Sequence, residues 1–249
     1  MYRLYQGDCL EVMKEIPDKS IDLILTDPPY GTTACKWDTV IDLDLMWTQL
    51  KRVIKPRGAI VLFGSEPFSS HLRMSNIKEY KYDWVWDKKT ATGGALASKR
   101  PMKAHENICV FYSKQPLYKR QWEEFTDDEV KKMRKHDFVC KNDETIGKGI
   151  HTSTGWFDGK KKNPKSVIRI NGITPASKEK KQGRHPTQKP VALMEYMIRT
   201  YTNQGETVLD FTMGSGTTGV AARRLARYFI GIELDPGYFE IAKKRIEDA

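Results

Sequence analysis

A strand, a glycine turn and a helix start follow one another directly near the end of the chain. The segment 208–210 (Val-Leu-Asp) forms an apolar strand pattern, and Gly214, Gly216 and Gly219 then fit a G-x-G-x-x-G pattern. Such a turn lets the backbone approach a ligand closely at a helix N-terminus. Glu233 ends the next apolar segment, where a carboxylate can hold ribose hydroxyls. This order predicts a ligand site at the carboxyl edge of an α/β sheet; a tight turn without a ligand is the alternative.

Other apolar segments predict the rest of the same sheet. Strand patterns occupy residues 21–25, 59–63, 84–86, 107–112, 206–211 and 228–233. Helical spacing occupies residues 43–54, 190–201, 216–225 and 236–246, and we expect one further helix at 127–135. Apolar strands that alternate with helices are typical of a mostly parallel, doubly wound sheet that helices cover on both faces.

A turn of two prolines follows the strand pattern at 21–25. Because proline ends both strands and helices, Asp27-Pro28-Pro29-Tyr30 places Tyr30 on a loop at the carboxyl end of that strand. The Asp27 carboxylate and the Pro28 carbonyl can together accept both N–H groups of an exocyclic amino group, while Tyr30 stacks on its ring. This arrangement suits direct attack on a methyl sulfonium, in which positioning supplies most of the acceleration. An ordinary proline turn is the alternative.

The positive charge of the chain is concentrated in one internal stretch. Lys and Arg total 42 against 32 Asp and Glu, for a net charge of +10. Residues 114–184 hold 18 of the basic and 10 of the acidic residues, a net of +8. Such a stretch predicts a polyanionic partner, and aromatic residues among the basic ones can stack on nucleic acid. A solvated loop is the alternative.

Composition excludes several other classes of protein. The sequence has no apolar run of the roughly 18 residues that a membrane span needs, and its N-terminus lacks an apolar signal core. Cys9, Cys35, Cys109 and Cys140 are scattered without a C-x-x-C pair. We therefore expect a cytoplasmic protein with reduced thiols, no disulfide framework and no metal site.

The proline turn and the glycine loop together resemble the amino-group DNA methyltransferases, which use S-adenosylmethionine (AdoMet) to methylate adenine N6 or cytosine N4. The chain order of proline turn, basic insert and glycine loop resembles the beta-type group. The resemblance implies a Rossmann-like AdoMet-dependent methyltransferase fold with a circularly permuted motif order. It also implies a catalytic and AdoMet-binding domain at 1–113 and 185–249 and an inserted target-recognition region at 114–184.

The resemblance assigns site residues one by one. Those implied to be catalytic are Asp27, Pro28, Pro29 and Tyr30. Those implied to bind the cofactor are Asp8, Cys9, Asp27, Lys189, Asp210, Phe211, Gly214, Ser215, Gly216, Thr217, Thr218 and Glu233. In this assignment Asp8 holds the adenine amino group of AdoMet, whereas its alternative is a helix N-cap; the alternative for Lys189 is a surface residue.

The chain departs from the family at one position. The family commonly has an aromatic residue two positions before the first glycine, where this chain has Thr212. We expect the preceding residue, Phe211, to pack instead, which leaves open the side chain that lies on the cofactor.

Lys160, Lys161 and Lys162 in the insert are expected to contact phosphates of double-stranded DNA, which gives affinity without sequence information. Lys99 and Arg100 lie in a stretch at 88–105 that we expect to be mobile and to bind DNA near the flipped base or the backbone, with solvent exposure as the alternative. The implied reaction is site-specific methylation of a base flipped out of the duplex. An aspartate that opens the proline turn favours adenine N6, with cytosine N4 as the alternative.

The resemblance further implies a role in restriction–modification and a possible homodimer. The remote alternative is a nicotinamide-dependent oxidoreductase, which only the glycine pattern supports.

Overall fold

The computed structural model describes residues 1–31, 38–129, 161–174, 177, 179 and 187–249. The chain divides into two compact units, Met1–Lys119 with Ser166–Ala249, and Arg120–Lys165. The second unit spans fewer residues than the insert expected at 114–184. The reason is that Val167–Arg169 forms a strand, β8, which pairs with Val85–Asp87 and so joins the sheet of the first unit.

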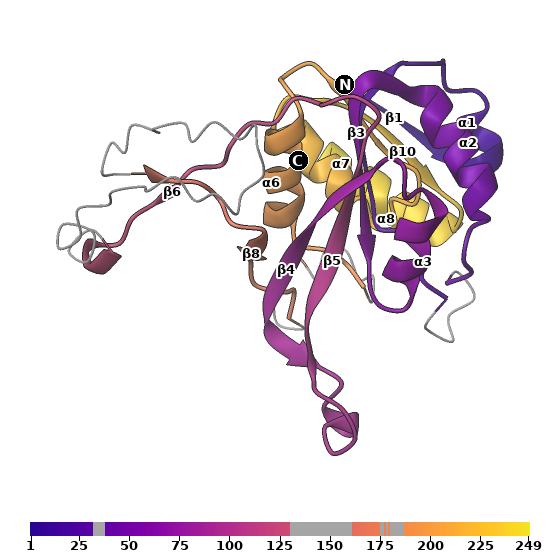
Figure 1. Ribbon diagram of the computed structural model, residues 1–249. Coiled ribbons are helices and arrows are strands. Elements are labelled where there is room, and N and C mark those ends of the chain that lie inside the picture. The colour runs from indigo at the N-terminus through magenta and orange to yellow at the C-terminus, as the bar shows by residue number, and fades with distance from the viewer. Residues whose placement is uncertain (32–37, 130–160, 175–176, 178, 180–186) are drawn as a thin grey trace. The chain divides into compact units, whose positions relative to one another are not determined.

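The first unit contains an eight-stranded sheet in the order β1-β10-β9-β2-β3-β5-β4-β8 (Figure 1). The strands are β1 (Tyr2–Gln6), β2 (Ile21–Thr26), β3 (Ile54–Gly64), β4 (Tyr80–Thr92), β5 (Lys103–Phe111), β8 (Val167–Arg169), β9 (Thr207–Asp210) and β10 (Tyr228–Glu233). The run from β1 to β3 is parallel, and β5 lies antiparallel to both β3 and β4. The prediction of a mostly parallel sheet is confirmed.

Helices pack on the two faces of this sheet and form two separate cores. Residues of α1 (Cys9–Met13), α2 (Leu43–Val53) and α3 (Phe68–Ser75) belong to one apolar cluster. Residues of α6 (Val191–Tyr201), α7 (Thr217–Arg224) and α8 (Pro236–Glu247) belong to the other. In β2, Leu23 faces the second cluster and Ile24 the first, and both are fully buried. A strand covered on both faces reads as a continuous apolar run, which is the pattern seen in the sequence.

The stretch at 88–105 continues two strands of the sheet, and its expected mobility stays a prediction. β4 continues to Thr92 and β5 begins at Lys103, so most of this stretch is a β-hairpin closed by a 3₁₀ turn at Gly94–Leu96. Gly93 adopts a left-handed conformation, with φ of 88°, which an L side chain would disfavour and which allows the strands to turn back. The sequence pattern also missed β1, α1 and α3.

The second unit is small. Its two-stranded sheet pairs β6 (Glu123–Glu124) with β7 (Lys161–Lys162) in antiparallel register. The Lys162 ammonium lies 2.9 Å from the Glu129 carboxylate, and the Arg120 guanidinium lies 4.5 Å from the centre of the Trp122 ring. The helix expected at 127–135 lies largely outside the described residues, and its three described residues are helical. Among the described residues, none of the helices is both long and apolar enough to cross a membrane.

Candidate active site

The carboxyl ends of β1, β2, β9 and β10 meet at one cavity of about 490 Å³. Parallel strands end at the same edge of a sheet, so segments far apart in sequence converge there. Of the residues expected in the site, those that line the cavity are Asp8, Cys9, Asp27, Pro28, Pro29, Tyr30, Lys189, Asp210, Phe211, Gly214, Ser215, Thr217, Thr218 and Glu233. The structure therefore brings the proline turn and the glycine turn to a single opening.

Asp210 connects the end of β9 to the end of β2. The Thr26 hydroxyl donates to Asp210 Oδ1 at 2.9 Å and accepts from the Phe211 N–H at 3.1 Å. The Thr212 hydroxyl donates to the carbonyl of Asp27 at 3.1 Å. Burial raises the pKa of Asp210 to about 7, although hydrogen bonds from Thr218 and Thr26 act in the opposite direction. These contacts fix the two turns relative to each other.

Glu233 holds the glycine turn from the neighbouring strand. Its Oε2 accepts from the Gly214 N–H at 2.8 Å, and its Oε1 accepts from the Asp235 N–H at 2.8 Å. Gly216 has φ of 78°, and a Cβ there would lie 2.9 Å from the Cβ of Ala242 on α8. Gly216 is not among the residues that line the cavity, and its contact with the cofactor stays a prediction. Its role is to let α7 pack closely against α8.

Arg245 of α8 binds the glycine turn through hydrogen bonds. It was not among the residues expected in the site. Its side chain is 9% exposed and donates to the Ser215 carbonyl, to the Ser215 hydroxyl at 3.0 Å and to the Thr217 hydroxyl at 3.4 Å. Burial lowers the pKa of Arg245. A signal was present in the sequence, because Arg245 lies next to Ile246 and three residues after Ala242 on the apolar face of the helix.

Asp8 caps helix α1, so the N-cap alternative is confirmed. Its Oδ1 accepts from the Leu10 N–H at 2.8 Å and from the Glu11 N–H at 3.4 Å. Asp8 also lines the cavity, which leaves its second oxygen for a ligand. The adjacent Cys9 is buried, and this burial raises the pKa of its thiol to about 12, so the thiol is neutral.

Two side chains hold the Asp27 carboxylate, one at each of its oxygens. The Tyr30 hydroxyl donates to Asp27 Oδ1 at 2.5 Å, and the Lys189 ammonium donates to Asp27 Oδ2. Asp38 fixes the turn, since its Oδ1 accepts from the backbone N–H of Tyr30 at 2.7 Å. The Tyr30 ring stacks on Phe68, with ring centres 5.1 Å apart. None of the described residues donates to the Pro28 carbonyl.

Lys189 belongs to a chain of alternating charges that reaches the proline turn. It is 5% exposed, so the surface alternative is wrong. Beyond Asp27 it lies 3.3 Å from Glu106 Oε2 without hydrogen-bond alignment, and Glu106 pairs with Lys88 at 3.2 Å. Burial lowers the pKa of Lys189, but the two carboxylates offset this effect and its pKa is raised. Neither Glu106 nor Lys88 carried a sequence signal that set it apart from ordinary strand residues.

The carboxylates of this chain respond to burial in different ways. Burial raises the pKa of Asp27, Lys189 lowers it, and Glu106 raises it again. Burial also acts to raise the pKa of Glu106, but Lys189 and Lys88 outweigh that effect and its pKa is lowered. Lys189 therefore acts to lower the pKa of both carboxylates, but the net shift is upward for Asp27 and downward for Glu106.

Phe211 packs in the core, as expected. It is 1% exposed and belongs to the apolar cluster beside α1 and α2, although it also forms part of the cavity wall. Thr212 lines the cavity at the position where the family has an aromatic residue.

The residues expected to bind DNA are not among those that line the cavity. Lys99 and Arg100 are exposed near the tip of the β4–β5 hairpin. Lys161 and Lys162 lie in β7 of the second unit, where Lys162 is engaged with Glu129. Lys160 lies outside the described residues. DNA binding by these five residues stays a prediction.

Fold and cavity define an α/β protein with a ligand site at the carboxyl edge of a permuted, mostly parallel sheet. Residues 21–244 match the model of the DNA methylase family of N6 and N4 methyltransferases. This match covers most of the chain, and the chain belongs to that family.

Two similar relatives are type II methyltransferases. M.HpaI of Haemophilus parainfluenzae is 29% identical over 257 residues, which cover 98% of this chain and 74% of the relative. M.HinfI of Haemophilus influenzae is 27% identical and covers 98% and 68% of the two chains.

Two solved structures are similar as well. The M1.HpyAVI–SAM complex is 27% identical, covers 99% of both chains and superposes with a TM-score of 0.64. The cytosine-N4-specific PvuII DNA methyltransferase is 19% identical, covers 98% of this chain and 86% of its own, and has a TM-score of 0.69. At that identity the second structure confirms the fold alone.

Proposed function

We propose that this protein transfers a methyl group from AdoMet to the exocyclic amino group of a base flipped out of double-stranded DNA. The observation that carries the proposal is that the Asp27–Tyr30 turn and the Gly214–Ser215 turn line one cavity. Family membership supports the reaction class, and the M1.HpyAVI structure supports the cofactor, because that relative was solved with SAM.

The charge of the cavity wall favours AdoMet over a dinucleotide. Asp8, Asp27, Asp210 and Glu233 all line it, and among the described lining residues Lys189 is the one Lys or Arg, already paired with Asp27. A pyrophosphate would meet carboxylates there, whereas the cationic sulfonium of AdoMet is attracted by them. The volume also suits a ligand of this size. The nicotinamide alternative is set aside for this reason and because of the family match.

The acceptor groups of the wall match the polar groups of AdoMet. A carboxylate has about four acceptor sites, and Glu233 uses two of them on backbone N–H groups. The remaining sites of Glu233 suit ribose hydroxyls, and the second oxygen of Asp8 suits the adenine amino group. AdoMet supplies a methyl group on a positively charged sulfur, which is a strong electrophile.

Asp27 and the Pro28 carbonyl orient the target amino group. Each accepts one N–H, which leaves the nitrogen lone pair directed at the methyl group, so positioning supplies most of the acceleration. Tyr30 and Lys189 hold the two Asp27 oxygens in place before the base arrives. When the N–C bond forms, the methyl–sulfur bond breaks and the sulfur leaves as a neutral thioether, while the amino nitrogen loses a proton. Asp27 is the nearest carboxylate, and because burial raises its pKa it is suited to accept that proton.

Tyr30 provides the second contact to the flipped base. Its ring packs on Phe68, which fixes its tilt, and Tyr30 also lines the cavity. We propose that the base stacks on this ring. A base paired inside a duplex could not reach the cavity, so flipping is part of the proposal.

We propose adenine N6 as the target because the first residue of the proline turn, Asp27, is an aspartate, which the family resemblance associates with adenine enzymes. Cytosine N4 is the alternative. The test is to express the chain in a bacterial host without DNA methylation and to analyse the nucleosides of its DNA by mass spectrometry. N6-methyladenine is the expected product, N4-methylcytosine would replace the adenine assignment, and neither product would overturn the proposal. Sequencing of modified bases across the same genome gives the recognition site.

A catalytic control separates this enzyme from background methylation. Asp27→Ala should nearly abolish the modified nucleoside while AdoMet binding, measured by calorimetry, persists. Asp44→Ala, which replaces an acid near the start of α2, should leave both unchanged.

The remaining proposals concern the setting in which the enzyme acts. We place it in the cytoplasm, as one component of a restriction–modification pair, and we propose a homodimer. Light scattering checks the last point against the chain mass of 28.7 kDa, and a monomer mass would remove it.

A further inference from the structure

The β4–β5 hairpin extends past the edge of the sheet at which the cavity lies. The last residue of β3, Gly64, pairs with Asn107, and β5 begins four residues earlier at Lys103. Because β5 is antiparallel to β3, these four residues continue beyond the carboxyl end of β3, by roughly 13 Å. Figure 1 shows both strands of the hairpin running on beyond the neighbouring part of the sheet.

The root of this hairpin is tied to the catalytic turn. Lys88 on β4 and Glu106 on β5 pair at 3.2 Å, and Glu106 lies 3.3 Å from Lys189, which pairs with Asp27. The hairpin therefore leaves the sheet directly beside the place proposed for the flipped base. A duplex that delivers a base into the cavity has to pass this hairpin.

The tip of the hairpin has a charge that suits DNA. Every residue from 89 to 103 is exposed. This stretch contains Lys89, Lys99, Arg100 and Lys103 and has no acidic residue. Four cations without a compensating anion fit the phosphates on either side of a duplex groove.

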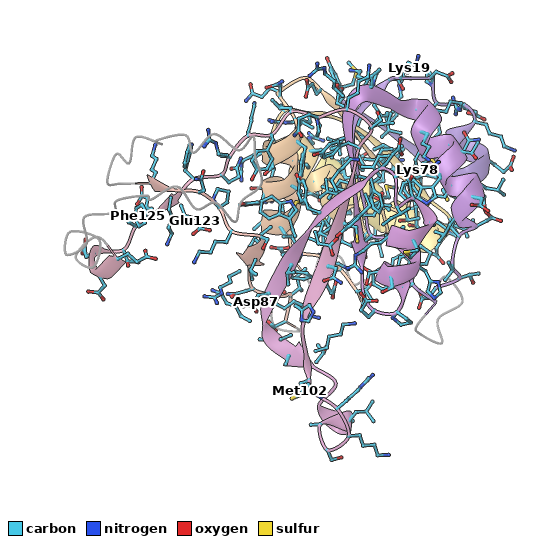
Figure 2. All side chains as sticks on the ribbon, viewed as in Figure 1. Lys19, Lys78, Asp87, Met102, Glu123 and Phe125 are labelled. Carbon is cyan, nitrogen blue, oxygen red and sulfur yellow. The ribbon has the colours of Figure 1, made fainter. Side chains whose placement is uncertain are left out.

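The tip also presents two apolar side chains to solvent. Leu96 is 40% exposed and Met102 is 44% exposed, and Figure 2 labels Met102 on the part of the hairpin beyond the sheet. They are not on a loose loop, because the N–H groups of Lys99 and Arg100 both donate to the Leu96 carbonyl, at 2.9 and 3.0 Å. The end of Met102 also lies close to the backbone of Gly94. An ordered turn thus exposes two apolar side chains to water among cations. Exposure of this kind costs free energy, and binding to a partner would offset that cost.

From these contacts we infer that the hairpin tip enters the DNA and fills the space that the flipped base leaves. Leu96 and Met102 act as the wedge, since aliphatic side chains inserted at a base step replace part of the lost stacking. Lys99 and Arg100 hold the phosphates beside it. The inference rests on the proposed function and assigns the hairpin a role that the cavity residues do not have.

The test uses two DNA duplexes that carry the recognition site mapped in the expression host. In one, the target base is paired; in the other, an abasic site stands opposite it, so that the base is already unpaired. The double variant Leu96→Ala/Met102→Ala should lose roughly tenfold or more of kcat/KM on the paired duplex and little on the unpaired one, because only the paired duplex needs the wedge. AdoMet binding should be unchanged.

A matched control and two other outcomes complete the test. Leu45→Ala removes a similarly exposed leucine, 55% exposed on α2, and should behave as the unmodified protein on both duplexes. Equal loss by the double variant on the two duplexes, or no loss on either, would overturn the wedge. If the unmodified protein methylated neither duplex, the proposed function itself would fail, which is a distinct result.

Discussion

The ammonium of Lys189 is bonded to the carboxylate of Asp27, although 162 positions separate the two residues along the chain. Lys189 precedes α6 and Asp27 follows β2, so the pair joins the start of this helix to the carboxyl end of the strand. The family resemblance assigned Lys189 to the residues that bind the cofactor. In the structure its charge acts on Asp27, the proposed catalytic residue, so we propose that Lys189 positions this carboxylate as well as forming part of the cavity wall.

Lys189→Met should shift the pH dependence of methyl transfer upward. Lys189 lowers the pKa of Asp27, so its removal raises that pKa and a higher pH is needed to ionise the carboxylate. The acid limb of the kcat–pH profile should move to higher pH, and kcat at neutral pH should fall by roughly a hundredfold, the scale of one lost electrostatic partner. Lys14→Met removes an exposed cation directly after α1 and serves as the control. If the acid limb did not move, the claim that Lys189 lowers the pKa of Asp27 would be contradicted.

Glu106→Gln should move the same limb in the opposite direction. The Glu106 carboxylate raises the pKa of Asp27, so a neutral amide lowers it and Asp27 stays ionised to lower pH. Lys88 and Lys189 each lose a charged partner, so the free energy of unfolding should fall, by about 1–3 kcal/mol. The pH profile and a urea titration measure the two effects. A shift in the same direction as for Lys189→Met would contradict the charge chain.

Asp210→Asn should remove part of the pH dependence of stability. The pKa of Asp210 is raised by burial to about 7, above its usual value of 3.8, so the folded protein binds a proton between these values that the unfolded chain releases. This contribution is fully present below pH 4 and is lost as pH rises through 7. Between pH 5 and pH 8 the unmodified protein should lose roughly 2–3 kcal/mol more stability than the variant. Urea denaturation at both pH values measures this difference. If the unmodified protein and the variant lost the same free energy of unfolding between pH 5 and pH 8, Asp210 would not titrate in this range.

Arg245→Met should weaken AdoMet binding more than it lowers kcat. Arg245 holds the Ser215 carbonyl and hydroxyl, so its loss loosens the glycine turn without touching Asp27. We expect the Kd for AdoMet, measured by calorimetry, to rise roughly tenfold, the equivalent of about 1.4 kcal/mol. The neighbouring Lys244→Met removes an exposed cation of α8 and serves as the control. A normal Kd would leave Arg245 with a purely structural role.

Tyr30→Ala should reduce activity more than Tyr30→Phe does. The phenylalanine variant keeps the ring that packs on Phe68 and loses only the hydroxyl that bonds Asp27. The alanine variant loses both, including the proposed stacking surface for the base. The comparison of kcat/KM on one duplex measures the difference. Equal losses would assign the role of Tyr30 to its hydroxyl.

The class of fold and the two turns of the site follow from the amino-acid sequence alone. The apolar runs at 21–25 and 228–233 are each long enough and flanked clearly enough to be identified as strands, and the structure has β2 and β10 there. Prolines restrict the backbone and glycines allow conformations that other residues disfavour, so the loops after β2 and β9 could also be predicted. Because both loops follow parallel strands, the sequence pattern also predicts that they meet at one edge of the sheet.

Which charges meet depends instead on the packing of the whole chain. The pairing of Asp27 with Lys189 and Glu106, and the support of Ser215 by Arg245, join residues whose distance in space is set by the assembled sheet and its helices. The same holds for the hairpin: the strands near Trp84 and Asn107 could be predicted, but their extension over a Lys- and Gly-containing stretch could not. A strand there is stabilised by pairing with its neighbour, and pairing is a long-range interaction that local propensity does not contain.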